Sequence, residues 1–163
     1  MDSDEQILAH VLSVWREAKK LFSLHGREGM LFLTDRHLMF VQKTQAKMRW
    51  WHAAAQRQVL TFLKSKNVMI RNDGYGEKQL LLDLENKKNM EISFDDILDI
   101  NYEDKNWGST LNLEFNKNGK KEKYQFTVVQ DWVKYPIKDP TKRMKVDWSP
   151  LVEYIKERQK FTR

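Results

Sequence analysis

The residues best suited to chemistry in this chain are cations gathered in one stretch. The segment 43–71 contains seven basic side chains and no acidic one. Positive charge without a nearby carboxylate favours contact with an anion, such as a lipid headgroup, a nucleic-acid phosphate or an acidic peptide. The predicted lipid- or anion-binding residues of this stretch are Lys43, Lys47, Arg49, Arg57, Lys64 and Lys66.

A second basic stretch lies near the end of the chain. Residues 134–145 contain five cations, of which Lys142 and Arg143 are further predicted anion-binding residues. By contrast, residues 83–104 contain eight acidic residues and only two lysines, within a net charge of +6. We therefore expect a lopsided charge distribution that turns one side of the molecule toward an anionic sheet or polymer.

Aromatic and apolar residues accompany the first basic stretch at helical spacing. Met48, Trp51, Ala55, Val59 and Phe62 recur every three or four residues, which predicts a helix over 45–66. A basic face beside an apolar face is typical of helices at membrane interfaces. The same apolar stripe could instead pack on a protein core, which would leave Trp50 exposed. The predicted partner-contact residues are Trp50, Trp51 and Phe62.

Motifs for catalysis, metals and cofactors are not found in the sequence. No two of the four histidines stand four residues apart, and the chain has no cysteine to act as a nucleophile or metal ligand. Asp95 and Asp96 are adjacent, so on a strand they would face opposite ways. We expect a non-enzymatic protein with no catalytic residues, no metal site and no cofactor.

Alternating apolar and polar residues predict a chain that is mainly β. The clearest hairpin pairs Leu111–Asn116 with Tyr124–Val128 around the turn Asn118-Gly119. The turn residues Asn72–Gly76 also suggest that 68–71 pairs with 78–84. The other predicted strands are 29–34, 38–43, 90–94 and the segment around Ile97, Ile100 and Tyr102.

The two ends of the chain give helix signals of unequal strength. Ser149 followed by Pro150 predicts the start of a C-terminal helix over 150–160, with Ser149 as its cap. Residues 3–20 are ambiguous: Ser3 and Gln6 are spaced as a helical capping box, yet the same apolar residues suit a bulged first strand.

Three segments in this order resemble the GRAM branch of the pleckstrin-homology superfamily. They are Asp4-Glu5-Gln6-Ile7-Leu8, the hairpin Gly29-Met30-Leu31-Phe32-Leu33-Thr34-Asp35-Arg36-His37-Leu38-Met39-Phe40, and Ile92-Ser93-Phe94-Asp95-Asp96-Ile97-Leu98-Asp99-Ile100. The resemblance implies an antiparallel β sandwich or partly open barrel of about seven strands, closed by a C-terminal helix. It favours a strand over Ile7–Val14, and it makes residues 44–67 a helical insertion.

The resemblance also implies a function class. It predicts a binding module, formed by residues 1–163 as one domain, that contacts anionic membrane lipid of the phosphoinositide type through the basic insertion. The alternative is a scaffold that binds a peptide or partner subunit, and a nucleic-acid binder ranks lower. No apolar run approaches the ~20 residues of a membrane span, so we expect a cytoplasmic protein able to associate peripherally with a membrane. The oligomeric state is left open.

Overall fold

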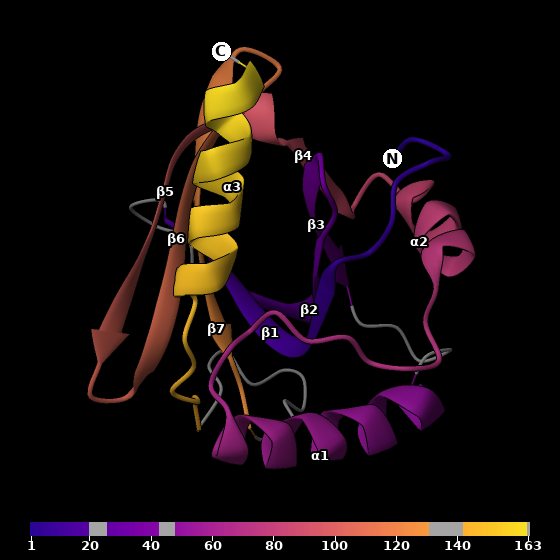
Figure 1. Cartoon of the computed structure of the whole chain (residues 1–163), viewed down its shortest axis with the longest axis vertical. Helices are drawn as coiled ribbons and strands as arrows, with labels where there is room; N and C mark the ends of the chain where they lie inside the picture. Colours follow the sequence, from indigo (N-terminus) through magenta and orange to yellow (C-terminus); the bar gives the residue numbers. More distant parts are fainter. Residues whose placement is uncertain (20–25, 43–47, 131–141, 163) are drawn as a thin grey trace.

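The computed structural model describes residues 1–19, 26–42, 48–130 and 142–162. Within them, seven antiparallel strands form one sheet in the order β4-β3-β2-β1-β7-β6-β5 (Figure 1). The strands are β1 Ala9–Ala18, β2 Gly26–Leu33, β3 His37–Gln42, β4 Met90–Ser93, β5 Ile97–Lys105, β6 Gly108–Lys117 and β7 Lys120–Val128. The helices are α1 Met48–Lys64, α2 Glu77–Leu84, the short 3-10 helix η2 Phe94–Asp96 and α3 Ser149–Thr162.

The C-terminal helix α3 packs against the connection between β4 and β5. The side-chain amide of Gln159 donates to the carbonyl oxygens of Phe94 and Ile97, at 2.8 and 3.0 Å. Tyr154 packs edge-on against Phe94, and Ile155 is fully buried. Seven antiparallel strands closed by such a helix confirm the predicted pleckstrin-homology-like fold class and the predicted C-terminal helix.

Strand β1 contains a bulge between Val11 and Val14. Ser13 has a φ of 53°, and the pairing of β1 with β2 shifts register between Val11 and Val14. A bulge leaves residues of one strand without ladder partners and bends the strand. The ambiguity over residues 3–20 is thus resolved in favour of a strand, as the resemblance implied.

Strands β2 and β3 are buried on both faces of the sheet. Leu31 and Phe40 face the main core, which also contains Phe126 and Ile155. Neighbouring residues on the opposite face, such as Phe32, enter a second core with Trp51 of α1 and Leu80 of α2. Burial on both faces explains why β2 and β3 read as continuous apolar runs.

The pairing predicted for 68–71 with 78–84 is wrong. Residues 77–84 form helix α2, in which Leu80 is buried while Leu82 is 65% exposed. The side chain of Gln79 accepts the backbone N–H of Gly76 at 2.8 Å and so caps the helix. A run of three leucines has no alternation, and the i, i+4 pair Leu80 and Leu84 is enough to seat one helical face on the core.

Two local features near the end of the chain follow from sequence signals. Asn118 and Gly119 have φ values of 52° and 80°, which is the turn that Asn-Gly favours in a two-residue hairpin. Helix α3 begins at Ser149 itself, and the carboxylate of Asp147 accepts the Ser149 N–H at 2.9 Å. Ser149 is therefore the first helical residue rather than the cap that the sequence predicted.

Candidate functional site

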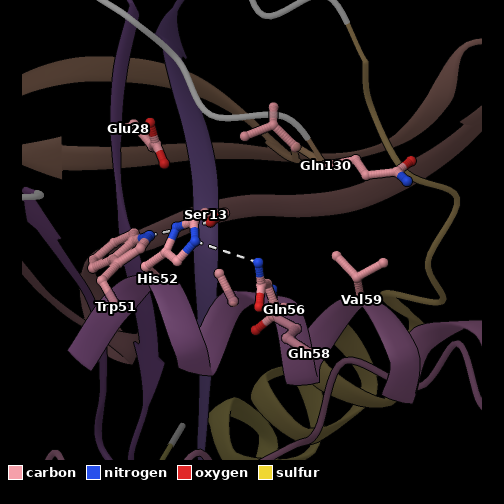
Figure 2. Close-up of a pocket in the computed structure, with 10 residues that line it drawn as sticks. Ser13, Glu28, Trp51, His52, Gln56, Gln58, Val59 and Gln130 are labelled. Atoms are coloured by element: carbon pink, nitrogen blue, oxygen red, sulfur yellow. Dashed lines mark hydrogen bonds between the residues drawn. The ribbon is translucent and has the colours of Figure 1, made fainter. Parts of the chain in front are cut away.

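Helix α1 lies across one end of the molecule (Figure 1). Trp51 is 1% exposed and Phe62 is 2% exposed. The indole N–H of Trp51 points to the bulge in β1 and donates to Ser13 Oγ at 3.2 Å (Figure 2). Trp51 lies in the second core and Phe62 in the main core, so the burial of both side chains argues against their predicted contact with a partner. The core-packing alternative is confirmed for Trp51 and Phe62, while Ala55 and Val59 are half-buried and the side chain of Met48 lies outside the described part of the chain.

A buried glutamine fixes α1 to the bulge. Gln58 Oε1 accepts the backbone N–H of Leu12 and Gln58 Nε2 donates to the Leu12 carbonyl oxygen, both at 2.8 Å. The side-chain amide thus replaces the strand partner that the bulge removes. Sequence reasoning missed this role, although a glutamine three residues after Ala55 and four before Phe62 falls within the apolar stripe.

Trp50 lies at the start of the helix and is half-buried rather than exposed. Its indole N–H donates to the carbonyl oxygen of Asp73 at 2.6 Å, and its ring stacks on Tyr75 with 5.7 Å between ring centroids. The Tyr75 hydroxyl donates to the carboxylate of Asp83 in α2, and burial together with this bond raises the pKa of Tyr75. The turn before α2 therefore covers Trp50, contrary to the expectation that it would be exposed.

The outward face of α1 combines cations with exposed leucines. Leu60 is 62% exposed and Leu63 is 74% exposed, although both lie outside the predicted apolar stripe. Arg57 and Lys64 are exposed on the same outward side. Among the described residues no carboxylate lies within ion-pair distance of either cation. A signal for this surface was present in the sequence, because apolar residues opposite a buried stripe have no core to enter.

The remaining predicted anion-binding residues have different surroundings. Lys66 and Lys142 are exposed. Arg143 pairs with Glu17 at 3.0 Å and donates to Thr127 Oγ1 at 3.2 Å, and its side chain is only 15% exposed. Anion binding by Arg143 stays a prediction, and its charge is already matched by Glu17 within the molecule. Lys43, Lys47 and the side chain of Arg49 lie outside the described part of the chain.

Two cavities among the described residues are poorly suited to an anionic headgroup. One of about 140 Å³ lies between α1 and the strands, with Ser13 and Gln58 in its lining (Figure 2). Pockets for small ligands are usually ~300 to 1,000 Å³. A groove of about 560 Å³ beside the end of α3 contains Arg36 and Arg158. Arg36 pairs with Asp2 at 2.7 Å and Arg158 lies 3.7 Å from Asp35, so acidic groups match both cations.

Residues 1–19, 26–42, 48–130 and 142–162 bring together no group of three histidine or acidic side chains able to hold a metal ion. Within the same ranges, none of the helices has the length and apolar character needed to span a bilayer.

Comparison with known proteins assigns no family to the chain. No protein-family model and no curated protein matches the chain. Among solved structures, the chain is similar to a Vps36 N-terminal PH domain, with 14% sequence identity and a TM-score of 0.49. The match covers 99% of this chain and 84% of the other. Strand order and the closing helix establish a pleckstrin-homology-like fold, and membership of the GRAM branch stays a prediction.

Proposed function

We propose that this protein is a non-enzymatic binding module that contacts an anionic membrane surface with the outward face of α1. The observation that carries the proposal is the pair of leucines, 62% and 74% exposed, beside cations that have no acidic partner among the described residues. Leu60 and Leu63 supply apolar surface, and Arg57 and Lys64 supply positive charge. The opposite face of the helix is fixed to β1 by Trp51, Gln58 and Phe62.

The physical gain expected at a bilayer is modest and reversible. A cation near an anionic membrane contributes on the order of 1 kcal/mol. A leucine moved fully from water into an apolar environment contributes roughly 1.5 to 3 kcal/mol. Two partly inserted leucines with two or three cations therefore suit peripheral attachment rather than permanent anchoring.

The form of the surface favours a bilayer over a single enclosed headgroup. The outward side chains of α1 lie on one face of a 17-residue helix, whereas of the two cavities described above one is small and the other has its cations matched by carboxylates. Recognition of a phosphoinositide-type headgroup stays a prediction, and so do the alternatives of a protein partner and of nucleic acid.

Sedimentation with vesicles tests the proposal. The protein is mixed with vesicles of phosphatidylcholine alone or with added phosphatidylserine, at low salt and at about 0.5 M salt, where screening is strong. We expect binding only to the anionic vesicles and release by salt. Arg57→Glu combined with Lys64→Glu should weaken binding at least tenfold, because each reversal replaces attraction with repulsion.

Matched control variants show whether binding depends on the α1 face or only on the net charge and apolar surface of the whole protein. Lys117→Glu with Lys120→Glu makes the same charge change at the turn between β6 and β7 and should have a much smaller effect. Leu60→Ala with Leu63→Ala should reduce binding, whereas Leu81→Ala with Leu82→Ala on α2 should not. Equal losses in target and control variants, or no vesicle binding at all, would overturn the proposal. Salt-sensitive retardation of nucleic acid without vesicles would favour a different ligand class.

A further inference from the structure

The turn between β5 and β6 presents an exposed tryptophan. Trp107 is 46% exposed, although a side chain of this size usually finds a place in a core or an interface. It belongs to no part of the α1 surface. A lone aromatic in a turn has no periodicity, so the sequence pattern contains no signal for Trp107.

The indole is held in place by a cation from another segment. The guanidinium carbon of Arg143 lies 4.9 Å from the Trp107 ring centroid, and Lys105 Nζ lies 5.9 Å from it. Arg143 is itself fixed by its ion pair with Glu17. A side chain stacked on a fixed guanidinium loses less conformational freedom on binding than one that is mobile.

This turn lies at the same end of the molecule as α1 (Figure 1). Lys145 Nζ is 3.5 Å from the carboxylate of Asp104, two residues before the turn. The hydroxyl of Ser109 donates to Asp104, and this bond, with the cations of Lys145 and Lys66, lowers the pKa of Asp104. Lys66 follows the last turn of α1, so the end of the helix and the turn share one group of charges.

From this arrangement we propose that Trp107 is a second membrane anchor, which lies at headgroup depth beside the α1 surface and fixes the orientation of the module on the bilayer. The inference rests on the proposed function of α1. Indole rings are enriched at membrane interfaces, because they have an apolar body and an N–H that stays hydrated. The exposed Lys66 suits the same anionic lipids, whereas Lys105 and Lys145 are paired with Glu103 and Asp104.

Site-specific labelling tests the orientation directly, since the chain has no cysteine of its own. Single cysteines replace Leu63 on α1, Asn106 in the β5–β6 turn and Lys121 beside the β6–β7 turn. Each carries an environment-sensitive fluorophore and is mixed with vesicles of phosphatidylcholine and phosphatidylserine. We expect a blue shift at positions 63 and 106 and none at position 121.

The labelling distinguishes failure of the second anchor from failure of the proposed function. A shift at 63 without a shift at 106 overturns the second anchor and leaves the proposed function intact. Vesicle binding with a shift at 121 alone overturns both, because another end of the molecule would face the lipid. In sedimentation, Trp107→Ala should weaken binding roughly tenfold, the scale of one interfacial aromatic. Phe161→Ala, at an exposed aromatic in α3, is the matched control and should bind as the unaltered chain does.

Discussion

Gln58 shows how one polar side chain can decide where a helix sits. Its amide satisfies both backbone groups of Leu12 in a position with 2% exposure. A buried donor or acceptor left without a partner costs roughly 1 to 3 kcal/mol. The bulge and the glutamine therefore stabilise each other, because each supplies the hydrogen-bond partners of the other.

Gln58→Ala should accordingly lower the free energy of unfolding by about 3 kcal/mol, because two buried backbone groups lose their partners. Gln56→Ala makes the same chemical change at an exposed position of α1 and should lower it by less than about 0.5 kcal/mol. Urea unfolding followed by circular dichroism measures both values. Similar values for the two variants would show that the Leu12 contacts contribute little.

Glu5 is a second residue whose surroundings make a quantitative prediction. Burial raises its pKa, but hydrogen bonds from the Asp2 N–H, the Thr34 hydroxyl and His37 outweigh burial, so the pKa of Glu5 is lowered overall. A lowered pKa means that the folded state favours the carboxylate. The resulting stability is complete above the unfolded pKa of about 4.3 and is lost as pH falls through the folded value.

The unaltered chain should therefore unfold at lower urea concentration as the pH falls below about 4.3, and Glu5→Gln should reduce this dependence. At neutral pH the same variant should lose about 2 kcal/mol, because an amide reproduces only part of the hydrogen bonding. Urea midpoints recorded over an acidic pH series provide the comparison. An unchanged pH slope in the variant would argue against a role for Glu5.

Single residues were predicted from the sequence with mixed success, for a physical reason. Charge and helical phase identify a basic helix, but they do not tell which long side chains find partners far along the chain. Arg143 meets Glu17 and Trp50 meets Asp73 only after the strands have assembled. Leu60 and Leu63 became informative only once the opposite face of α1 was known to be buried.

At the scale of elements, α1 and α2 are joined through the turn that carries Gly74. This glycine has a φ of +97°, and a Cβ at its position would clash with the indole of Trp50. The close approach lets Trp50 reach the Asp73 carbonyl oxygen and stack on Tyr75. The loop that carries Gly74 therefore fixes the N-terminal end of α1, and Gln58 fixes the middle of the helix to β1.

Gly74→Ala should destabilise the fold by about 2 to 3 kcal/mol, since it combines a strained φ with a displaced indole. In a Trp50→Ala background the clash disappears, and only about 1 kcal/mol of backbone strain should remain. A double-mutant cycle on unfolding free energies measures the difference. Additive losses would mean that Gly74 and Trp50 are not coupled.

Element predictions succeeded where the signal is local. The Asn118-Gly119 hairpin and the C-terminal helix are specified by adjacent residues, whereas α2 was mistaken for a strand. Its three consecutive leucines satisfy neither a strict alternation nor an obvious amphipathic pattern. The capping by Gln79 and the burial of Leu80 decided the outcome, and burial depends on the sheet to which the helix docks.

At the scale of the whole molecule, about seven antiparallel strands closed by a C-terminal helix could be predicted, because the segments that resemble the GRAM branch include several of these strands. What the sequence could not give is which end carries the exposed cations. In the described structure helix α1 and the turn between β5 and β6 lie at one end, with Lys66 close to Asp104, while the β6–β7 turn lies at the far end (Figure 1). A bilayer at the α1 end would therefore leave the opposite end in water.

Both ends of the chain lie away from α1 in Figure 1, with the last turn of α3 farthest from it. On a vesicle held by the α1 surface, an epitope tag at either terminus would stay within reach of an antibody in the surrounding buffer. The module could thus be captured or imaged through its termini without displacing it from lipid.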